Sequence, residues 1–185
     1  MARSPFRSPR VHRCVAIKPR AARADVAPTP ARAGLCSRSS PPRLVAVATG
    51  DDQLFGQEHV RAYRETGGER GYHWHGTEIL LLSTTGRGSG EERTTPLIHR
   101  NDAGRWVIVA SNGGSTEHPA WYRNLSADDE ATVQVKEDVV PVRARTATGE
   151  ERERLWGLMT EVWPAYDDYQ ARTEREIPVV VLERR

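Results

Sequence analysis

The segment Leu80–Ile98, LLLSTTGRGSGEERTTPLI, constrains the fold more than any other part of the sequence. An apolar run leads into a connection that holds three glycines and an arginine, and a polar segment, Arg93–Ile98, follows it. This pattern predicts a β-hairpin with a bare, cationic connection. Glycines let backbone N–H groups come close to a ligand, and Arg87 and Arg93 carry charge that suits a phosphate or a carboxylate. A plain flexible hairpin loop explains the same glycines, so this segment alone does not decide between the two interpretations.

Short strands separated by turn residues continue downstream of this hairpin. Apolar or alternating runs predict strands at about 77–83, 93–100, 106–110, 131–136, 139–146 and 177–182. Helical patterns lie at about 57–66, 119–125, 148–163 and 165–174, and a capping box is expected where the third begins, at Thr148–Glu151. Consecutive antiparallel strands with helices added late favour a mainly β fold with peripheral helices. We expect a small barrel of about six strands and three or four helices.

The first fifty residues differ from the rest in composition. They carry nine Arg, one Lys and a single acidic residue, Asp25, whereas the whole chain has a formal charge of +2. Such a segment cannot bury enough apolar area to offset the entropy lost on ordering. We therefore expect a disordered extension over residues 1–50 and one folded domain over residues 51–185. An organelle transit peptide and a misassigned start codon are alternative explanations of the extension.

Several classes of function are disfavoured by the composition of residues 51–185. Both cysteines, Cys14 and Cys36, lie in the extension, and the spaced pair His73 and His75 has no third ligand nearby, so no metal site is expected. No run approaches the roughly 18 apolar residues of a membrane span, which favours a soluble, cytoplasmic chain. The domain is mildly acidic and lacks a basic patch with interleaved aromatics, so nucleic acid is not an expected partner.

The sequence also lacks the usual signs of catalysis by side chains alone. No nucleophile–base pair with an orienting group, no P-loop and no pair of carboxylates in an apolar setting is evident in it. A long anionic cofactor, in contrast, needs loops rich in N–H groups and guanidinium groups at its polar end, and aromatic or apolar walls around a flat ring system. The glycine-rich hairpin and the aromatic residues that follow it fit hydride transfer in which a cofactor supplies the chemistry.

Four blocks of the sequence, taken in their order and spacing, resemble the deazaflavin-dependent nitroreductase family. They are Leu80–Ile98, Trp106–Gly114 (WVIVASNGG), His118–Leu125 (HPAWYRNL) and Pro164–Leu182 (PAYDDYQARTEREIPVVVL), and the resemblance covers about residues 55–185. This resemblance implies a split β-barrel of the FMN-binding type that uses coenzyme F420. It also implies an oxidoreductase in which reduced F420 transfers a hydride to a small electrophilic acceptor, such as a quinone, an enone or a nitro compound.

The resemblance further implies a set of site residues. Tyr166, Tyr169 and Ser111 are the expected catalytic residues, as sources of a proton beside the reactive face. The expected cofactor-binding residues match the family's motifs and are Arg87, Gly88, Ser89, Arg93, Thr94, Thr95, Pro96, Leu97, Ile98, Val109, Ala110, Ser111, Asn112, Ala120, Trp121, Tyr122, Arg123, Asn124 and Tyr166.

Two departures from the family's pattern bear on cofactor affinity. The family often has Lys or Arg at the position of Gly88 and Lys at that of Asn112. Each lost charge-assisted contact is worth roughly 1.5–3 kcal/mol, so we expect weaker cofactor binding unless Arg87, Arg93 or Arg123 compensates. A non-catalytic F420- or flavin-binding carrier, and an enzyme that uses FMN, are the alternatives that these departures leave open.

Two further properties stay open at the level of the sequence. Split barrels of this size often dimerise, but no dimer interface can be read from the residues. The extension carries a charge of about +9, which permits peripheral association with the anionic inner face of the plasma membrane.

Overall fold

A computed structural model describes residues 50–185 of the chain. The predicted disorder of the extension therefore falls, apart from Gly50, outside the described residues. The elements of the described part are β1 (His73–Trp74), β2 (Thr77–Thr85), β3 (Glu92–Ile98), β4 (Arg100–Asp102), β5 (Arg105–Val109), β6 (Glu130–Val135), β7 (Asp138–Thr146), β8 (Val179–Arg184), the helices α1 (Gly56–Glu65), α2 (Ala120–Leu125), α3 (Gly149–Val162) and α4 (Ala165–Ala171), and two 3₁₀ turns, η1 (Gly50–Gln53) and η2 (Asn112–Gly114).

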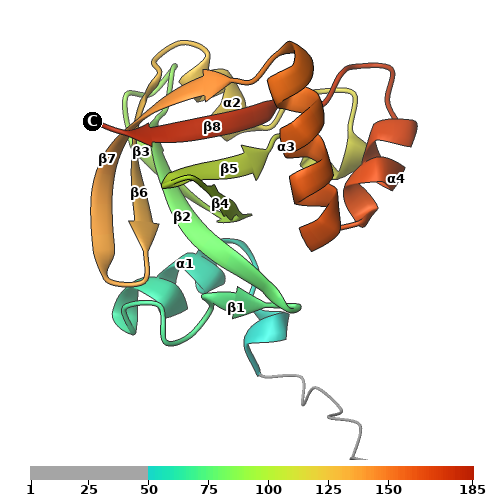
Figure 1. Ribbon diagram of the computed structural model, residues 1–185. Helices are drawn as coiled ribbons and strands as arrows, with labels where there is room; N and C mark the ends of the chain where they lie inside the picture. Colours follow the sequence, from blue (N-terminus) through green and yellow to red (C-terminus); the bar gives the residue numbers. More distant parts are fainter. Residues whose placement is uncertain (1–49) are drawn as a thin grey trace, which may run out of the picture. The chain divides into compact units, whose positions relative to one another are not determined.

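The strands form one antiparallel sheet in the order β1-β2-β6-β7-β8-β5-β4, with β3 paired to β2. β2 pairs along much of its length with two strands at once, so that Leu82 lies opposite both Thr95 of β3 and Val133 of β6. The sheet curls around an interior, while α3 and α4 lie beside β5 and β8 and α1 lies near β2 (Figure 1). This curled antiparallel sheet with peripheral helices confirms the predicted split barrel.

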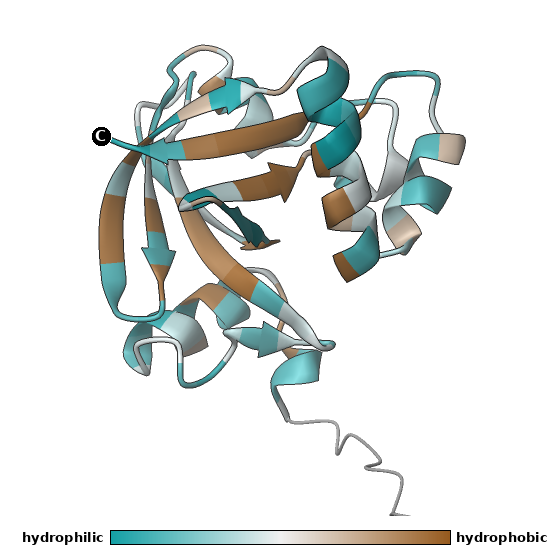
Figure 2. Cartoon of the chain, in the orientation of Figure 1, coloured by the Kyte–Doolittle hydropathy of each residue, from teal (hydrophilic) through white to brown (hydrophobic). Residues whose placement is uncertain are grey.

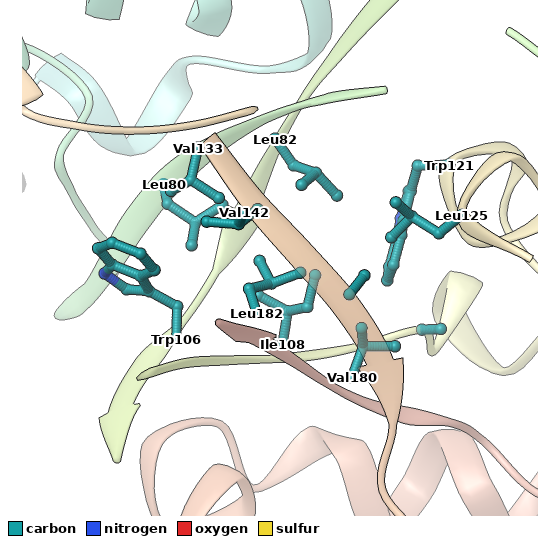
Figure 3. Packing of buried hydrophobic residues seen from close by; sticks show 12 residues of the cluster. Leu80, Leu82, Trp106, Ile108, Trp121, Leu125, Val133, Val142, Val180 and Leu182 are labelled. Atoms are coloured by element: carbon teal, nitrogen blue, oxygen red, sulfur yellow. The ribbon is translucent and has the colours of Figure 1, made fainter. Parts of the chain in front are cut away.

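β2, β5 and β8 contain almost continuous apolar runs (Figure 2), and most residues of these strands are buried, so both faces of each strand are covered. Alternate residues of a strand point to opposite faces of the sheet. Leu80 and Leu82 therefore point into the barrel interior, where Trp121 and Leu125 of α2 join them (Figure 3). Ile79 and Leu81 point outward and pack with the buried residues of α1, such as Tyr63.

The outward faces of β5 and β8 are covered in the same way by the two late helices. One apolar cluster joins these two strands to the helices. It contains Val107 and Val109 of β5, Val179 and Val181 of β8, Leu155 and Met159 of α3, and Tyr166 of α4. Residues in this cluster are almost fully buried, and each such aliphatic side chain contributes about 1.5–3 kcal/mol when it is removed from water. The helices are thus held on the sheet by apolar burial, and this placement sets the position of Tyr166.

The structure differs from the sequence-based prediction in three details. Two short strands, β1 and β4, occupy a predicted loop and a predicted turn, because they are too short and polar to show a period. The turn after β4 consists of Ala103 and Gly104, both with positive φ, as tight hairpin turns require. The predicted capping box is wrong, since the side chain of Thr148, the N-cap of α3, makes no capping hydrogen bond.

Candidate functional site

Two adjoining cavities lie along β3. One, the apolar cleft, has a volume of about 320 Å³ and predominantly apolar walls, and the other, the polar cavity, has a volume of about 460 Å³. Thr95 lines both cavities. The apolar cleft is lined by Leu54, Phe55, Gly56, His59, Trp74, Ile79, Thr95, Pro96, Leu97, Ile98, Val109, Ser111, Gly113, Trp163, Tyr166 and Tyr169. The polar cavity is lined by Gln57, Gly86, Arg87, Gly88, Arg93, Thr94, Thr95, Ala120, Trp121 and Asn124.

β3 supplies one wall to each cavity because it is paired with β2 along one side only. Its first half, Arg93–Thr95, faces the polar cavity, and its second half, Thr95–Ile98, faces the apolar cleft. Pro96 lies opposite Leu81 in this pairing. A proline has no N–H to donate and is tolerated in a strand with a free side, which explains why it is accommodated at this position.

The glycine-rich connection between β2 and β3 forms a closed loop at the polar cavity. The N–H of Gly86 donates to the carbonyl of Glu91 at 2.8 Å, and the N–H of Gly90 donates to the carbonyl of Gly86 at 2.7 Å. A side chain at position 86 would meet Ser89 Oγ at 2.8 Å and the Glu91 carbonyl at 3.1 Å, so glycine allows the loop to close this tightly without a shift of either group. The sequence predicted a ligand-approaching loop, and the structure places its backbone on a cavity wall.

Asn124 holds this loop in place. Its Nδ2 donates to Thr84 Oγ1 at 3.1 Å, and its Oδ1 accepts from the backbone N–H of Arg87 at 3.3 Å. Asn124 is buried, so its hydrogen bonds are shielded from water. It lines the polar cavity, and both ends of its amide are engaged with the protein.

The two arginines of the loop differ in their surroundings. Arg93 Nη2 lies 2.6 Å from Glu91 Oε2, and both side chains are about two-thirds exposed. Arg87 forms no salt bridge with any residue between 50 and 185. The polar cavity therefore contains one cation that is paired with a neighbouring carboxylate and one that has no acidic partner within the described chain.

Aromatic side chains enclose the apolar cleft. Tyr166 is 5% exposed, and its ring centroid lies 6.1 Å from that of Tyr169, one helical turn later. Burial, and then the neighbouring Tyr169, raises the pKa of Tyr166, so its hydroxyl stays protonated near neutral pH. Trp163, after α3, and Trp74, in β1, have ring centroids 5.8 Å apart and join two distant segments at the cleft.

The connection from β5 to α2, residues 110–119, contributes Ser111 and Gly113 to the apolar cleft. Gly114 packs against α4 so closely that a side chain there would meet the Tyr169 carbonyl at 2.8 Å. Arg175, from the segment between α4 and β8, donates to carbonyl groups of this connection at Ala110, Ser111 and Ser115. Arg175 belongs to the last of the four sequence blocks, but nothing local to it indicates that it reaches back about 60 residues.

Most of the predicted site residues line one of the two cavities, and five do not. Ala110 is fully buried, and Ser89 lies next to Gly86 with its Oγ accepting from the N–H of Glu91. Asn112 donates to the Glu117 carbonyl, Arg123 lies 3.5 Å from Glu117 Oε2, and the Tyr122 hydroxyl is bonded to Thr146. Arg123 is therefore paired outside the polar cavity, whose wall contains the cations Arg87 and Arg93.

One wall of the apolar cleft comes from the beginning of the domain, and its residues were not predicted from the sequence. Leu54, Phe55 and His59 lie at or near the start of α1, and Trp74 belongs to a segment predicted as a loop. Tertiary packing of α1 and β1 brings these residues to β3, and no motif marks them. A signal was present in Phe55, an aromatic residue just before a predicted helix, which the structure leaves 82% exposed at the cleft.

Comparison with known proteins identifies the family to which this arrangement belongs. The sequence model of the F420H(2)-dependent quinone reductase family matches residues 55–184. The chain belongs to this family. The F420H(2)-dependent quinone reductase Rv1261c of Mycobacterium tuberculosis is 39% identical over 131 residues, which cover 69% of this chain and 88% of that relative.

Solved structures agree with this assignment. The F420-H2 dependent reductase FDR-A is 43% identical, with a TM-score of 0.54 over 57% of this chain and 93% of that one. A structure described as a domain-swapped dimer is 38% identical, with a TM-score of 0.57 over 69% of this chain and 93% of that one. Membership of the F420H(2)-dependent quinone reductase family confirms the predicted deazaflavin-dependent family, the oxidoreductase class and reduced F420 as the cofactor.

Proposed function

We propose that this member of the F420H(2)-dependent quinone reductase family reduces a quinone or a similar flat electrophile in the apolar cleft. The deazaflavin ring of F420 occupies the cleft beside β3, and the phosphate and glutamate tail extends into the polar cavity. The observation that carries this proposal is that Thr95 lines both cavities, since apolar walls and cations then lie on the two sides of one residue of β3.

The residues present fit such a cofactor. A flat aromatic ring system needs apolar walls, which Pro96, Leu97, Ile98 and Val109 supply. An anionic tail needs guanidinium groups and closely approaching backbone, which Arg87 and the loop at Gly86 and Gly88 supply. When bound, reduced F420 supplies the hydride and carries the redox chemistry.

The chain's own contribution is to bind, orient and protonate. β3 fixes the ring between its edge and the late helices, and the aromatic side chains exclude water from the cleft. Reduction of a quinone also requires a proton at the acceptor oxygen. Tyr166, whose hydroxyl stays protonated, lines the cleft together with Tyr169 and Ser111, so these three residues are the candidates to hold or relay that proton.

Titration of the purified protein with F420, followed by cofactor fluorescence, tests the site. Arg87→Ala is expected to weaken binding at least about tenfold, or about 1.4 kcal/mol, because the variant removes the cation of the polar cavity that has no acidic partner among residues 50–185. Arg143→Ala is the matched control, since Arg143 lies on β7 in exposed salt bridges with Asp129 and Glu130. Absence of binding by the wild type at tens of micromolar, or equal effects of both variants, would contradict the placement.

A carrier without turnover is the second candidate function, and the missing charges at Gly88 and Asn112 motivate it. Reduced F420 would then bind but would not be oxidised by any quinone or nitroaromatic in a panel. Rapid oxidation by one quinone rejects the carrier. The absorption spectrum of the protein as purified separately tests the alternative of an FMN enzyme.

Dimer formation and membrane association are also proposals for this chain. The relative described as a domain-swapped dimer supports a test of the oligomeric state by light scattering. None of the helices between residues 50 and 185 is long and apolar enough to span a bilayer. Binding of the full chain and of a chain without residues 1–50 to anionic liposomes, at low and high salt, tests the peripheral association that the charge of the extension permits.

A further inference from the structure

Arg175 connects the end of the chain to the β5–α2 connection through four contacts. Its Nε donates to the Ser115 carbonyl at 2.8 Å, and its Nη2 donates to the Ser111 carbonyl at 2.7 Å and to the Ala110 carbonyl at 3.3 Å. Its Nη1 lies 3.2 Å from His118 Nδ1. A planar guanidinium group with five N–H donors can satisfy several fixed acceptors at once, which an ammonium group cannot do.

These contacts set the direction of the neighbouring backbone N–H groups. In a planar trans peptide the C=O and the N–H point in opposite directions. Because Arg175 draws the carbonyls of Ala110 and Ser111 toward itself, the N–H groups of Ser111 and Asn112 point away from it. Within residues 50–185 no carbonyl or side chain accepts a hydrogen bond from these two N–H groups or from that of Gly113.

The backbone of the connection is also shaped to gather these groups. Ser111 has right-handed helical dihedral angles, and Asn112 and Gly113 both have positive φ. This alternation turns successive N–H groups toward one side and forms a small concavity that suits an anionic or carbonyl oxygen. Ser111 and Gly113 line the apolar cleft, so the concavity belongs to the wall where the cofactor is proposed to bind.

His118 is the residue of this arrangement whose protonation state can change. An arginine only donates, so Nδ1 of His118 must be the acceptor and its proton must reside on Nε2. The groups that face the imidazole are Arg175, the Tyr122 ring at 4.9 Å, and Arg123 with its partner Glu117. A proton on Nδ1 would remove the acceptor and place a second cation against Arg175.

We propose that Arg175 is a positioning residue of the cofactor site and that the neutral His118 sets its position, so that protonation of His118 loosens the cofactor. This inference rests on the proposed function, because it takes the wall at Ser111–Gly113 to contact F420. Burial, and then the charges of Arg175 and Arg123, lowers the pKa of His118 below its ordinary value of 6.5. Affinity is therefore retained at neutral pH and is lost as the pH falls through that lowered pKa.

The experiment compares the dissociation constant of F420 for the full chain at about pH 8 and at about pH 5, the range over which histidine titrates. His118→Asn keeps an acceptor oxygen near the position of Nδ1 but cannot take up a proton in this range. The wild type is expected to lose about tenfold more affinity than His118→Asn on acidification, a difference of about 1.4 kcal/mol. Any titration of the ligand itself is common to both proteins. His73→Asn, at an exposed histidine of β1, is the matched control and should behave as the wild type.

A second pair of variants tests Arg175 itself. Arg175→Lys keeps the charge but not the planar set of donors, so it is expected to bind F420 several-fold more weakly at about pH 8 and to lose the His118-dependent pH response. Equal pH dependence of the wild type and His118→Asn would overturn the inference, even if Arg175→Lys destabilises the fold.

Failure of the proposed function has a different signature. If the wild type binds no F420 at either pH, the proposed function is overturned, and the backbone ¹⁵N resonances of Ser111–Gly113 then decide whether Arg175 and His118 position this wall. Resonances that follow a titration in the wild type but not in His118→Asn support that positioning. Resonances that titrate in neither protein overturn it.

Discussion

Glu91 holds Arg93 in a salt bridge of 2.6 Å beside the polar cavity, within the hairpin that the cofactor is proposed to contact. Both side chains are about two-thirds exposed, and a surface pair of this kind contributes at most about 1 kcal/mol to stability. The pair therefore matters less for folding than for binding. An anionic group that approaches Arg93 has to compete with the Glu91 carboxylate.

Replacement of Glu91 by glutamine is accordingly expected to tighten F420 binding. The variant frees Arg93 and removes one negative charge beside the cavity, and a gain of about threefold corresponds to a surface ion pair of about 0.6 kcal/mol. Fluorescence titration at low and moderate salt measures it. Glu153→Gln, at an exposed site on α3, removes the same charge elsewhere. Equal gains in the two variants would attribute the effect to net charge and contradict a local competition.

Asn124 is predicted to act on the site through the hairpin loop. Asn124→Ala leaves Thr84 Oγ1 and the N–H of Arg87 without their partner, so we expect the free energy of unfolding to fall by about 1–3 kcal/mol and F420 binding to weaken. Asn124→Asp keeps an acceptor for the N–H of Arg87 but adds a negative charge to the polar cavity. Urea unfolding should show a smaller loss for the aspartate variant, and fluorescence titration should show weaker binding. An aspartate variant that binds F420 as well as the wild type would contradict this role.

The sequence predicted the barrel and the hairpin because these features have local signals, whereas most of the cavity-lining residues were predicted from the resemblance to the family's motifs. Apolar runs at Leu80 and Trp106 mark strands buried on both faces, and the glycines around Arg87 mark a close backbone approach. What the sequence did not predict depends on which side chains pair with one another in the folded chain. Whether Arg123 or Arg87 serves the polar cavity depends on the pairing of Arg123 with Glu117.

The wall of the apolar cleft that comes from the beginning of the domain also could not be predicted from the sequence. Phe55 and His59 reach β3 because α1 packs on the outward face of β2, where Ile79 and Leu81 are buried, and Trp74 reaches the cleft because β1 pairs with β2. A helix pattern predicts that α1 has an apolar face, but it does not say which strand receives that face. The contacts of Arg175 could not be predicted for a related reason. Its acceptors are backbone carbonyl groups, which every residue type carries.

Gly114 is predicted to couple the cofactor-facing connection to α4. In Gly114→Ala the new methyl group would meet the Tyr169 carbonyl at 2.8 Å, and the residue would have to keep a φ of +83°. Gly113→Ala has a φ of +63° but nothing within 4 Å of the new atom, so it reports the backbone strain alone, about 1–3 kcal/mol. Urea unfolding should show the larger loss for Gly114→Ala, and reductase activity should fall more, because α4 carries Tyr166 and Tyr169. Equal losses would mean that α4 moves aside freely.

His99 is predicted to make the fold sensitive to acid. It is 3% exposed, and its Nδ1 has no hydrogen-bond partner within residues 50–185. Burial lowers its pKa to about 4, against the opposing influence of Glu78, whereas an unfolded histidine titrates near 6.5. Below 6.5 the unfolded chain therefore binds a proton that the folded chain does not bind until about pH 4, and this contribution to stability is lost as the pH falls through that window.

Between about pH 7 and about pH 5 this difference amounts to about 2 kcal/mol for His99 alone. His99→Leu removes the titration and keeps an apolar side chain in the buried position, so its free energy of unfolding should fall by about 2 kcal/mol less than that of the wild type over the same interval. Urea unfolding curves at the two pH values measure both quantities. His73→Asn, which replaces an exposed histidine, should keep the acid sensitivity of the wild type. If His99→Leu instead loses as much stability on acidification as the wild type, the sensitivity comes from other groups, because the buried imidazole is then not the site that takes up the proton on unfolding.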